Sequence, residues 1–363
     1  MSRPVTRRRT RAKVLRWGTN LSFVLPFALV YVLFLLYPVL QAGLMSLFDW
    51  DLLGSVRDYV GLRNYTTMLG GTGIIWSAGH RWVLRLLLLL VAAAVGAWAW
   101  RGRRLRAGEV LLITSLVAVA VLMGFHPGPG GSWYDTRFWN ALENTVVFTL
   151  VSTPLIAGLG LVFALLLNRP GRMTGFYRAA LFVPYVLPVS MTTLVWGYLL
   201  NPSRGIVSRL TEALGMGTIE WLTTPGLAMG AVVVTTVWWT VGFNMILFGA
   251  GLQDIDPTLY EAAALDGAGP WQKLLHITLP GLRHATLLVV VTQVIASFQI
   301  FGQVNIMTSG GPAGTTDVLV RYIYQTGFRD KDLGYASAVS LFLFVLMVGV
   351  SLIQFLMSRQ RKG

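Results

Sequence analysis

Long uncharged apolar stretches dominate the pattern of hydrophobic and polar positions along the chain. A helix that crosses a membrane needs about 20 mostly apolar residues, and eight stretches approach or exceed that length. They are residues 21–44, 83–100, 109–125, 141–167, 179–200, 226–250, 284–307 and 336–357. The second and third are the shortest, but the run from Leu86 to Val95 is too apolar for a loop. The pattern predicts an all-α polytopic membrane protein with about eight transmembrane helices.

The composition supports a membrane protein. Of the 363 residues, 55% are hydrophobic and only 12% are charged, whereas soluble globular domains carry about 25% charged residues. This argues against a single soluble domain, and the high hydrophobicity excludes a disordered chain. The absence of cysteine from the sequence excludes a disulfide framework, a thiolate metal site and a cysteine nucleophile.

The distribution of charge predicts the orientation, because Lys and Arg collect on the cytoplasmic side of a membrane. With the N-terminus inside, the inner segments hold 19 of the 29 Lys and Arg residues and 5 of the 15 Asp and Glu residues. These segments are 1–20, 101–109, 168–178, 251–283 and the C-terminal tail. The formal net charge of +14 then lies on one face and the outer side is neutral. We expect a multi-pass protein of the cytoplasmic (inner) membrane with both termini cytoplasmic, its basic start beside anionic lipid rather than nucleic acid.

No energy-converting or catalytic motif is present. None of the four lysines follows a glycine, so the chain has no P-loop for ATP. The four histidines show no HExxH spacing, and no Gly-x-Ser-x-Gly elbow occurs. We therefore expect no catalytic residue, metal site or cofactor in this chain, and we expect that it is not an enzyme. Buried charges are scarce in the spans, which argues against an ion-coupled carrier and favours a pore-forming subunit driven by another chain.

The segment 254–280, between the sixth and seventh spans, predicts two short helices. Asp256 is a good N-cap, Pro257 suits the first helical position, and Gly267 suits the left-handed position after the helix. Pro270 begins the second helix and Pro280 ends it. From these features alone, the segment is either an amphipathic connector at the inner surface or a docking element whose acidic side chains face a basic partner.

The same segment resembles the EAA signature of permease subunits in binding-protein-dependent ABC importers. The matching positions are Glu261, Ala262, Ala263, Gly267, Ile277, Leu279 and Pro280. The stretch 138–145 resembles that family's entry to its first core helix. The motif Thr-Ser-Gly-Gly-Pro at 308–312 and the run Leu-Asp-Gly-Ala at 265–268 resemble the sugar-importer, MalF-like branch. The resemblance covers about 138–358 together with the first span.

The resemblance implies a type I ABC importer permease core (MetI/MalF-like) with an inserted transmembrane hairpin. The implied divisions are a basic cytoplasmic segment 1–20, a first transmembrane helix 21–44, an outer loop 45–137 with the hairpin at about 83–125, a core 138–358 and a tail 359–363. The core contains the coupling loop 254–280. The hairpin is either a lipid-facing flank or a surface that binds a regulator or a further subunit.

As in the family that it resembles, the chain would form half of a translocation pathway that alternates between inward-facing and outward-facing states. Its implied partners are a second permease subunit in a heterodimer, a dimer of ATPase subunits that hold ATP and Mg, an extracytoplasmic substrate-binding protein and the lipid bilayer. The coupling loop would dock into the ATPase. The residues implied in this coupling are Glu261, Ala262, Ala263, Asp266, Gly267, Ile277, Leu279 and Pro280.

Uncharged polar and aromatic residues within the spans are the candidate substrate pathway. They are Trp239, Asn244, Ser297, Gln299, Phe301 and Gln303. Aromatic faces stack on the C–H faces of sugars and amides bond to hydroxyls, so the set favours a sugar, such as a maltose- or trehalose-like α-glucoside oligosaccharide. The same residue types also suit helix packing. The alternatives are a permease for glycerol-phosphate-type or other polyol substrates and, with less support, a self-contained carrier or channel.

Overall fold

The computed structural model describes residues 24–54, 57–101, 107–168 and 171–359. The predicted basic segment 1–20, most of the inner turn at 101–109 and most of the tail 359–363 lie outside this range. The chain divides into two compact units, Met1–Tyr65 with Thr326–Phe342 and Thr66–Gln325 with Leu343–Gly363. Each unit is described by itself.

The predicted helical membrane fold is confirmed, but the count of eight spans is not. Within the described residues, four helices are long and apolar enough to cross a membrane: Val24–Met45, α6 (Thr136–Leu167), α10 (Leu227–Gln253) and α17 (Leu333–Arg359). Two bent helix pairs bring the number to as many as six. The first span includes a π-helical segment, η1 (Val32–Leu36), which leads into α2 (Tyr37–Met45).

The predicted span 179–200 is not one straight helix, because the chain bends there by 100° between α7 (Thr174–Val186) and α8 (Val189–Leu199). Pro188 has no N–H to continue the helix, and it restricts the residue before it to extended backbone. Leu187 accordingly has ψ 138°. Pro184 in α7 and Pro188 at the bend were both visible in the sequence as signals of a helix break.

The predicted span 284–307 is interrupted between Phe298 and Gly302. A bend also precedes it, because α12 (Pro270–Lys273), η2 (Leu274–Thr278) and α13 (Leu279–Gly281) form one run that bends by 62° into α14 (Arg283–Phe298). The chain resumes as α15 (Gly302–Met307), which packs on α8. A Cβ at Gly302 would lie 3.0 Å from Val189 Cγ1, so glycine allows this close approach.

The inserted hairpin consists of α4 (Trp82–Arg101) and α5 (Ala107–Leu122), which pack against each other. Its ends are joined by an antiparallel pair, β3 (Gly71–Trp76) with β4 (Phe125–Trp133). Arg85 of α4 donates to the backbone oxygen of Ala120 in α5 at 2.8 Å. The 16 residues of α5 extend only about 24 Å at 1.5 Å per residue, less than the ~30 Å of the hydrocarbon core.

The smaller unit contains a second two-stranded sheet that the sequence did not predict, β1 (Phe48–Trp50) with β2 (Arg57–Tyr59). Helix α3 (Arg63–Leu69) follows it. Asn64 donates from Nδ2 to the backbone oxygens of Ser46 at 2.8 Å and Phe48 at 3.2 Å, which ties this helix to the end of the first span.

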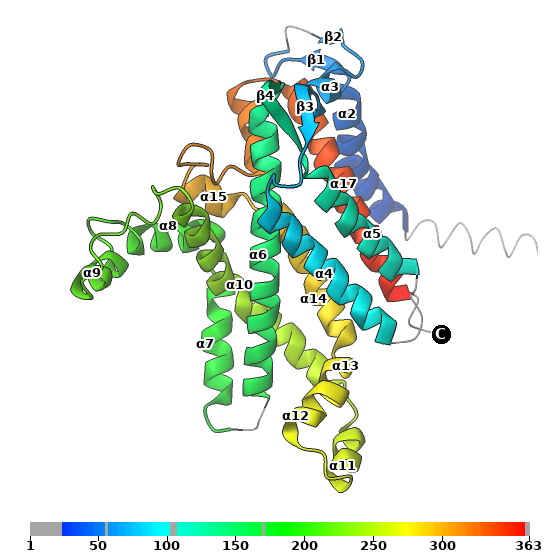
Figure 1. Ribbon diagram of the computed structural model, residues 1–363, viewed down its shortest axis with the longest axis vertical. Coiled ribbons are helices and arrows are strands. Elements are labelled where there is room, and N and C mark those ends of the chain that lie inside the picture. The colour runs from blue at the N-terminus through cyan, green and yellow to red at the C-terminus, as the bar shows by residue number, and fades with distance from the viewer. Residues whose placement is uncertain (1–23, 55–56, 102–106, 169–170, 360–363) are drawn as a thin grey trace, which may run out of the picture. The chain divides into compact units, whose positions relative to one another are not determined.

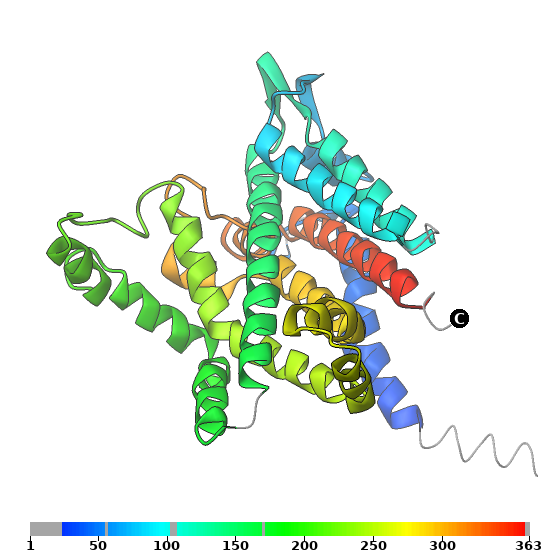
Figure 2. The ribbon, with the colours of Figure 1, turned by 60° about the horizontal axis from the view of Figure 1, so that its bottom comes forward.

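The core of the larger unit is built around α10, which packs against α6, α7 and α14 (Figures 1 and 2). Small residues let the helix backbones approach closely, as is typical of membrane helices. A Cβ at Gly242 of α10 would lie only 1.9 Å from the backbone oxygen of Leu181 in α7. The adjoining ends of α6 and α7 lie at the same end of this unit as α11 (Pro257–Leu265) (Figure 1). The remaining short helical elements are α9 (Ile206–Ala213), α16 (Leu319–Tyr324) and η3 (Gln325–Arg329).

Candidate functional site

The coupling loop begins with α11, and its predicted caps are confirmed. The backbone N–H of Thr258 donates to Asp256 Oδ1 at 2.9 Å. Hydrogen bonds from the backbone and side chain of Thr258 lower the pKa of the Asp256 carboxyl. At the other end, Gly267 has φ +76°. The N–H of Gly267 bonds to Ala264 O at 3.2 Å and that of Ala268 bonds to Ala263 O at 2.8 Å. This pair of bonds is the Schellman motif, which needs the left-handed residue that glycine supplies.

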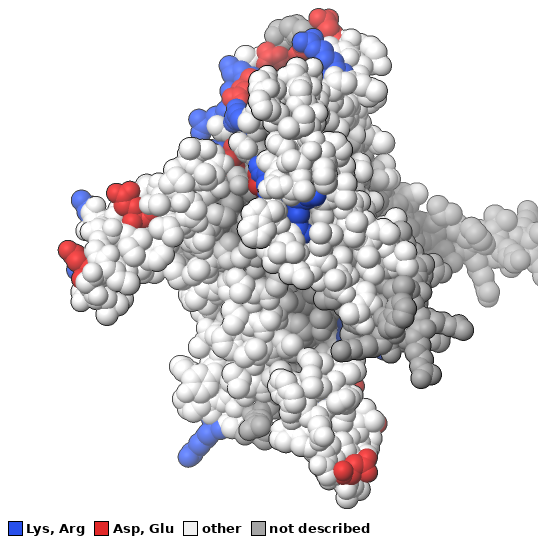
Figure 3. Space-filling model, in the orientation of Figure 1, with Lys and Arg blue, Asp and Glu red and all other residues white. Residues whose placement is uncertain are grey.

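The tip of this loop exposes apolar side chains beside acidic ones. The side chain of Leu265 is 90% exposed and that of Trp271 is 68% exposed. Glu261 and Asp266 are also exposed, and Figure 3 shows acidic side chains at this end of the unit. Exposed large apolar side chains on a short projecting element are typical of a contact surface. This tip suits a partner whose surface is apolar and basic.

The base of the loop is fixed to the helix core. Tyr260 OH lies 3.0 Å from Thr278 Oγ1, so α11 is tied to η2. Ile277 packs against the core cluster of α6, α10 and α14, and Ile255 lies against Gly281. Leu279 and Pro280 are exposed in α13. The predicted coupling residues therefore include exposed ones, at the tip and in α13, and Ile277, which packs on the helix core.

A buried polar network joins three helices of the core. Asn244 of α10 donates from Nδ2 to Gln293 Oε1 at 3.4 Å, and Gln293 of α14 donates from Nε2 to Ser297 Oγ at 3.3 Å. Ser297 Oγ also lies 3.2 Å from Ser152 Oγ and 3.4 Å from Thr153 Oγ1, both on α6. All five side chains are buried and uncharged. We call these five residues the polar network.

Of the predicted pathway residues, the structure brings together Asn244 and Ser297, with Gln293 between them. Trp239 instead donates from Nε1 to the backbone oxygen of Leu187 at 3.1 Å, at the bend between α7 and α8. The other three residues follow the end of α14. Gln299 is exposed, and its Nε2 lies 3.6 Å from Met347 Sδ. The ring centre of Phe301 lies 5.4 Å from that of Tyr324, and Gln303 is buried.

Sequence reasoning missed Ser152 and Thr153 as partners of the predicted pathway residues. Their signal was two adjacent hydroxyl side chains, followed by Pro154, inside an otherwise apolar span. Each hydroxyl alone could bond to its own helix, so the sequence did not show that they meet α14.

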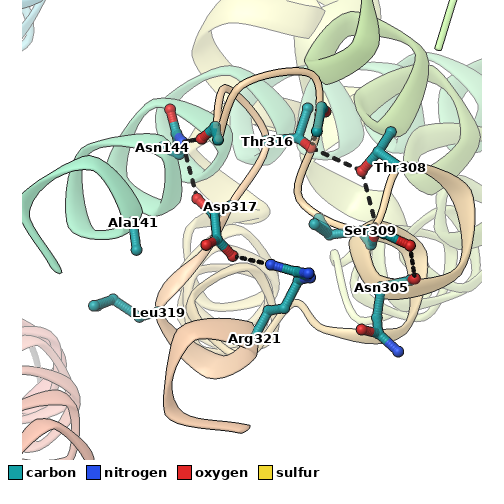
Figure 4. A network of polar contacts seen from close by, with 12 residues as sticks. Ala141, Asn144, Asn305, Thr308, Ser309, Thr316, Asp317, Leu319 and Arg321 are labelled. Carbon is teal, nitrogen blue, oxygen red and sulfur yellow. Dashed lines mark hydrogen bonds and ion pairs between the residues drawn. The ribbon is translucent and has the colours of Figure 1, made fainter. Parts of the chain in front are cut away.

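The loop after α15 forms a second polar cluster, against the first turns of α6 (Figure 4). Thr308 Oγ1 and Thr316 Oγ1 lie 2.7 Å apart and close the loop. Asn144 of α6 donates from Nδ2 to the backbone oxygens of Gly314 and Asp317, both at 2.9 Å. Arg321 Nη1 bonds to Asp317 Oδ1 at 2.7 Å, and both side chains are largely buried. The loop is therefore fastened in one conformation at the end of α6.

Residues 145–363 match the family model described as "Binding-protein-dependent transport system inner membrane component". The lactose transport system permease protein LacF of Rhizobium radiobacter is 36% identical over 237 residues, which cover 63% of this chain and 79% of that protein. The trehalose/maltose transport system permease protein MalF of Thermococcus litoralis is 34% identical over 229 residues, which cover 62% and 76%.

Two further similarities extend this comparison. The sn-glycerol-3-phosphate transport system permease protein UgpA of Agrobacterium fabrum is 34% identical over 224 residues, which cover 61% of this chain and 75% of that protein. Among solved structures, a bacterial ABC transporter involved in the import of the acidic polysaccharide alginate has a chain that matches with a TM-score of 0.70 at 19% identity. The match covers 98% of this chain and 100% of that chain.

Proposed function

The chain belongs to the family of binding-protein-dependent transport system inner membrane components and is a sugar ABC importer permease, and from this premise we propose that it forms half of the pathway for a neutral oligosaccharide of the maltose or trehalose type. The observation that carries the proposal is the polar network of α6, α10 and α14. Its amides and hydroxyls can donate to and accept from sugar hydroxyls, and none of its members is charged.

The geometry of the polar network suits a site that exchanges partners. The contacts of Ser297 Oγ with Ser152 Oγ and Thr153 Oγ1 measure 3.2 and 3.4 Å, longer than the usual 2.7–2.8 Å between hydroxyls. The bond from Gln293 Nε2 measures 3.3 Å, longer than the usual 2.9–3.0 Å for an N–H donor. Long, weak bonds cost little to replace. Separation of α14 from α6 would free the same groups to bond to a substrate.

The coupling loop would connect this site to a separate ATPase dimer, which holds the ATP and Mg. The exposed tip of α11 would dock on that ATPase, and the anchored base would transmit its displacement to α10 and α14, the helices that carry Asn244, Gln293 and Ser297. The complex would also include a second, related permease and an extracytoplasmic binding protein. The loop would face the cytoplasm, as would both termini.

A glycerol-phosphate-type substrate is the second candidate, favoured by the similarity to UgpA. A phosphate group would be expected to meet a cation in the pathway. Among the buried side chains in the described part of the chain, only Asp317 carries a charge, and it is an acid paired with Arg321. A neutral sugar therefore fits the polar network better.

The test is uptake of maltose, trehalose and lactose by vesicles that contain the complete complex with Gln293→Leu. Loss of one substrate hydrogen bond, about 1 to 1.5 kcal/mol, should reduce uptake of the transported sugar about tenfold. Thr292→Val is the matched control, because Thr292 Oγ1 bonds only within its own helix, to Leu288 O at 2.9 Å and Val289 O at 3.1 Å. Equal uptake by the Gln293→Leu variant and the control would remove the polar network from the pathway.

A further inference from the structure

A cavity of about 400 Å³ opens beside the first turns of α6, between this helix, the loop after α15 and α16. Its polar lining side chains are Arg137, Asn140, Ser309, Asp317, Arg321 and Gln325, and glycines and an alanine of the loop complete the wall. A volume of this size lies within the usual range for small-molecule sites, about 300–1,000 Å³. None of these residues belongs to the polar network.

Two arginines and one aspartate line this cavity. Asp317 and Arg321 form an ion pair, with Nη1 to Oδ1 at 2.7 Å and side chains that are only 10% and 11% exposed. The guanidinium of Arg137 lies 5.3 Å from the ring centre of Tyr322, where it faces an aromatic partner. An anionic ligand would compete with Asp317 for Arg321, and the Asp317 carboxylate would repel it.

What the lining offers instead is a mixture of hydrogen-bond donors and acceptors. The amides of Asn140 and Gln325 do both, the Ser309 hydroxyl does both, and the ion pair presents a carboxylate beside a guanidinium. Neighbouring hydroxyls of a sugar ring also donate and accept, so they complement this arrangement.

The cavity is formed before any ligand arrives. Asn144 and the contact between Thr308 and Thr316 hold the loop against α6 (Figure 4). A Cβ at Gly310 would lie 2.4 Å from Arg321 Nη1, so only glycine leaves room for that side chain in the wall. Such a site loses little conformational entropy on binding.

We propose that this cavity is an entry subsite for a neutral sugar ring, distinct from the polar network. Asn140 and Ser152 are 12 residues apart on α6, which places the two sites about 18 Å apart along the helix. The proposal rests on the proposed function, since a sugar must pass this end of α6. The lining residues include no aromatic ring on which a sugar could stack, so binding is weak, as a transit site requires.

The experiment is saturation-transfer NMR on the purified complete permease–ATPase complex without its binding protein, with maltose, trehalose and lactose as separate probes. The measurement is made on a Gln293→Leu background, so that the contribution of the polar network is reduced. We expect Asn140→Leu to weaken the sugar signal about fivefold, the value for loss of about one hydrogen bond. Asn305→Leu is the matched control, because Asn305 does not line the cavity and lies on the side of the loop away from Asn144 (Figure 4).

Four outcomes would overturn the entry subsite. They are no signal with any of the three sugars, an unchanged signal in Asn140→Leu, an equal loss in Asn305→Leu, and a signal with glucuronate or inorganic phosphate, added as further probes, but not with neutral sugars. The uptake test of Gln293→Leu fails or succeeds independently of these results, so the two proposals are separable.

Discussion

Replacement of Gly267 by valine isolates the backbone conformation of the coupling loop. Gly267 has φ +76°, and a Cβ built there meets nothing within 4 Å. The substitution therefore adds no clash and removes no side-chain contact. Its effect comes only from the left-handed conformation, which a β-branched residue adopts poorly.

The magnitude follows from the cost of that conformation. An L-residue with a side chain pays about 1–2 kcal/mol in the left-handed region, and this lowers the population of the docking conformation by a factor of roughly 5 to 30. The apparent dissociation constant of a partner rises by the inverse of the competent fraction. We therefore expect the complex with the ATPase to weaken roughly 5- to 30-fold, and ATP-driven uptake to fall with it.

The assay is affinity of the purified ATPase for the detergent-solubilised permease, with membrane insertion followed by a fluorescent fusion. Gly267→Asn should lie between wild type and Gly267→Val, because asparagine tolerates the left-handed region. Gly269→Val is the matched control: φ is −71° there, and the nearest atom to its Cβ is Gln272 Oε1 at 3.9 Å. Wild-type affinity in Gly267→Val, or an equal loss in Gly269→Val, would refute the reasoning.

Three further predictions concern packing, charge and coupling. Gly242→Ala places a Cβ 1.9 Å from the α7 backbone and should destabilise the chain by about 1–3 kcal/mol. The measurement is the melting temperature in detergent, which should fall. Gly230→Ala is the control and should not lower it, because a Cβ there meets nothing within 4 Å. Burial, with neighbouring acids, raises the pKa of Asp332, so the wild type should gain stability as the pH falls from about 7 towards the ordinary carboxyl value near 4. Asp332→Asn should melt higher at about pH 7 and lose that gain; an unchanged pH profile would contradict the assignment. Tyr260→Phe removes the 3.0 Å contact with Thr278 and should reduce uptake more than it reduces ATPase binding. Both are measured on the same preparation. Equal losses would argue against transmission through the loop base.

Features that depend on short stretches of chain were predictable from the sequence. The lengths of the apolar runs placed α6, α10 and α17 to within a few residues, because the thickness of the bilayer fixes the length of a spanning helix. The caps of α11 at Asp256 and Gly267 were also predictable, since each is satisfied by hydrogen bonds to residues two to five positions away. The prolines around 184–188 carried the signal of a bend, but not its angle.

Tertiary packing decided the rest. Asn244, Ser297 and Ser152 lie on three different helices. Whether a polar side chain in a membrane helix bonds to a neighbour or lines a pathway depends on the rotation of that helix about its axis. The apolar pattern hardly constrains this rotation, because almost every position is hydrophobic. The cavity beside α6 likewise brings Asn140 together with Asp317, which is 177 positions later in the chain. The sequence by itself determined which segments form the long apolar helices α6, α10 and α17 and where the loop after α10 turns, because these follow from local hydrophobicity and local hydrogen bonds. Only the tertiary structure decided which polar groups meet, because that depends on how closely glycines such as Gly242 allow helices far apart in sequence to approach.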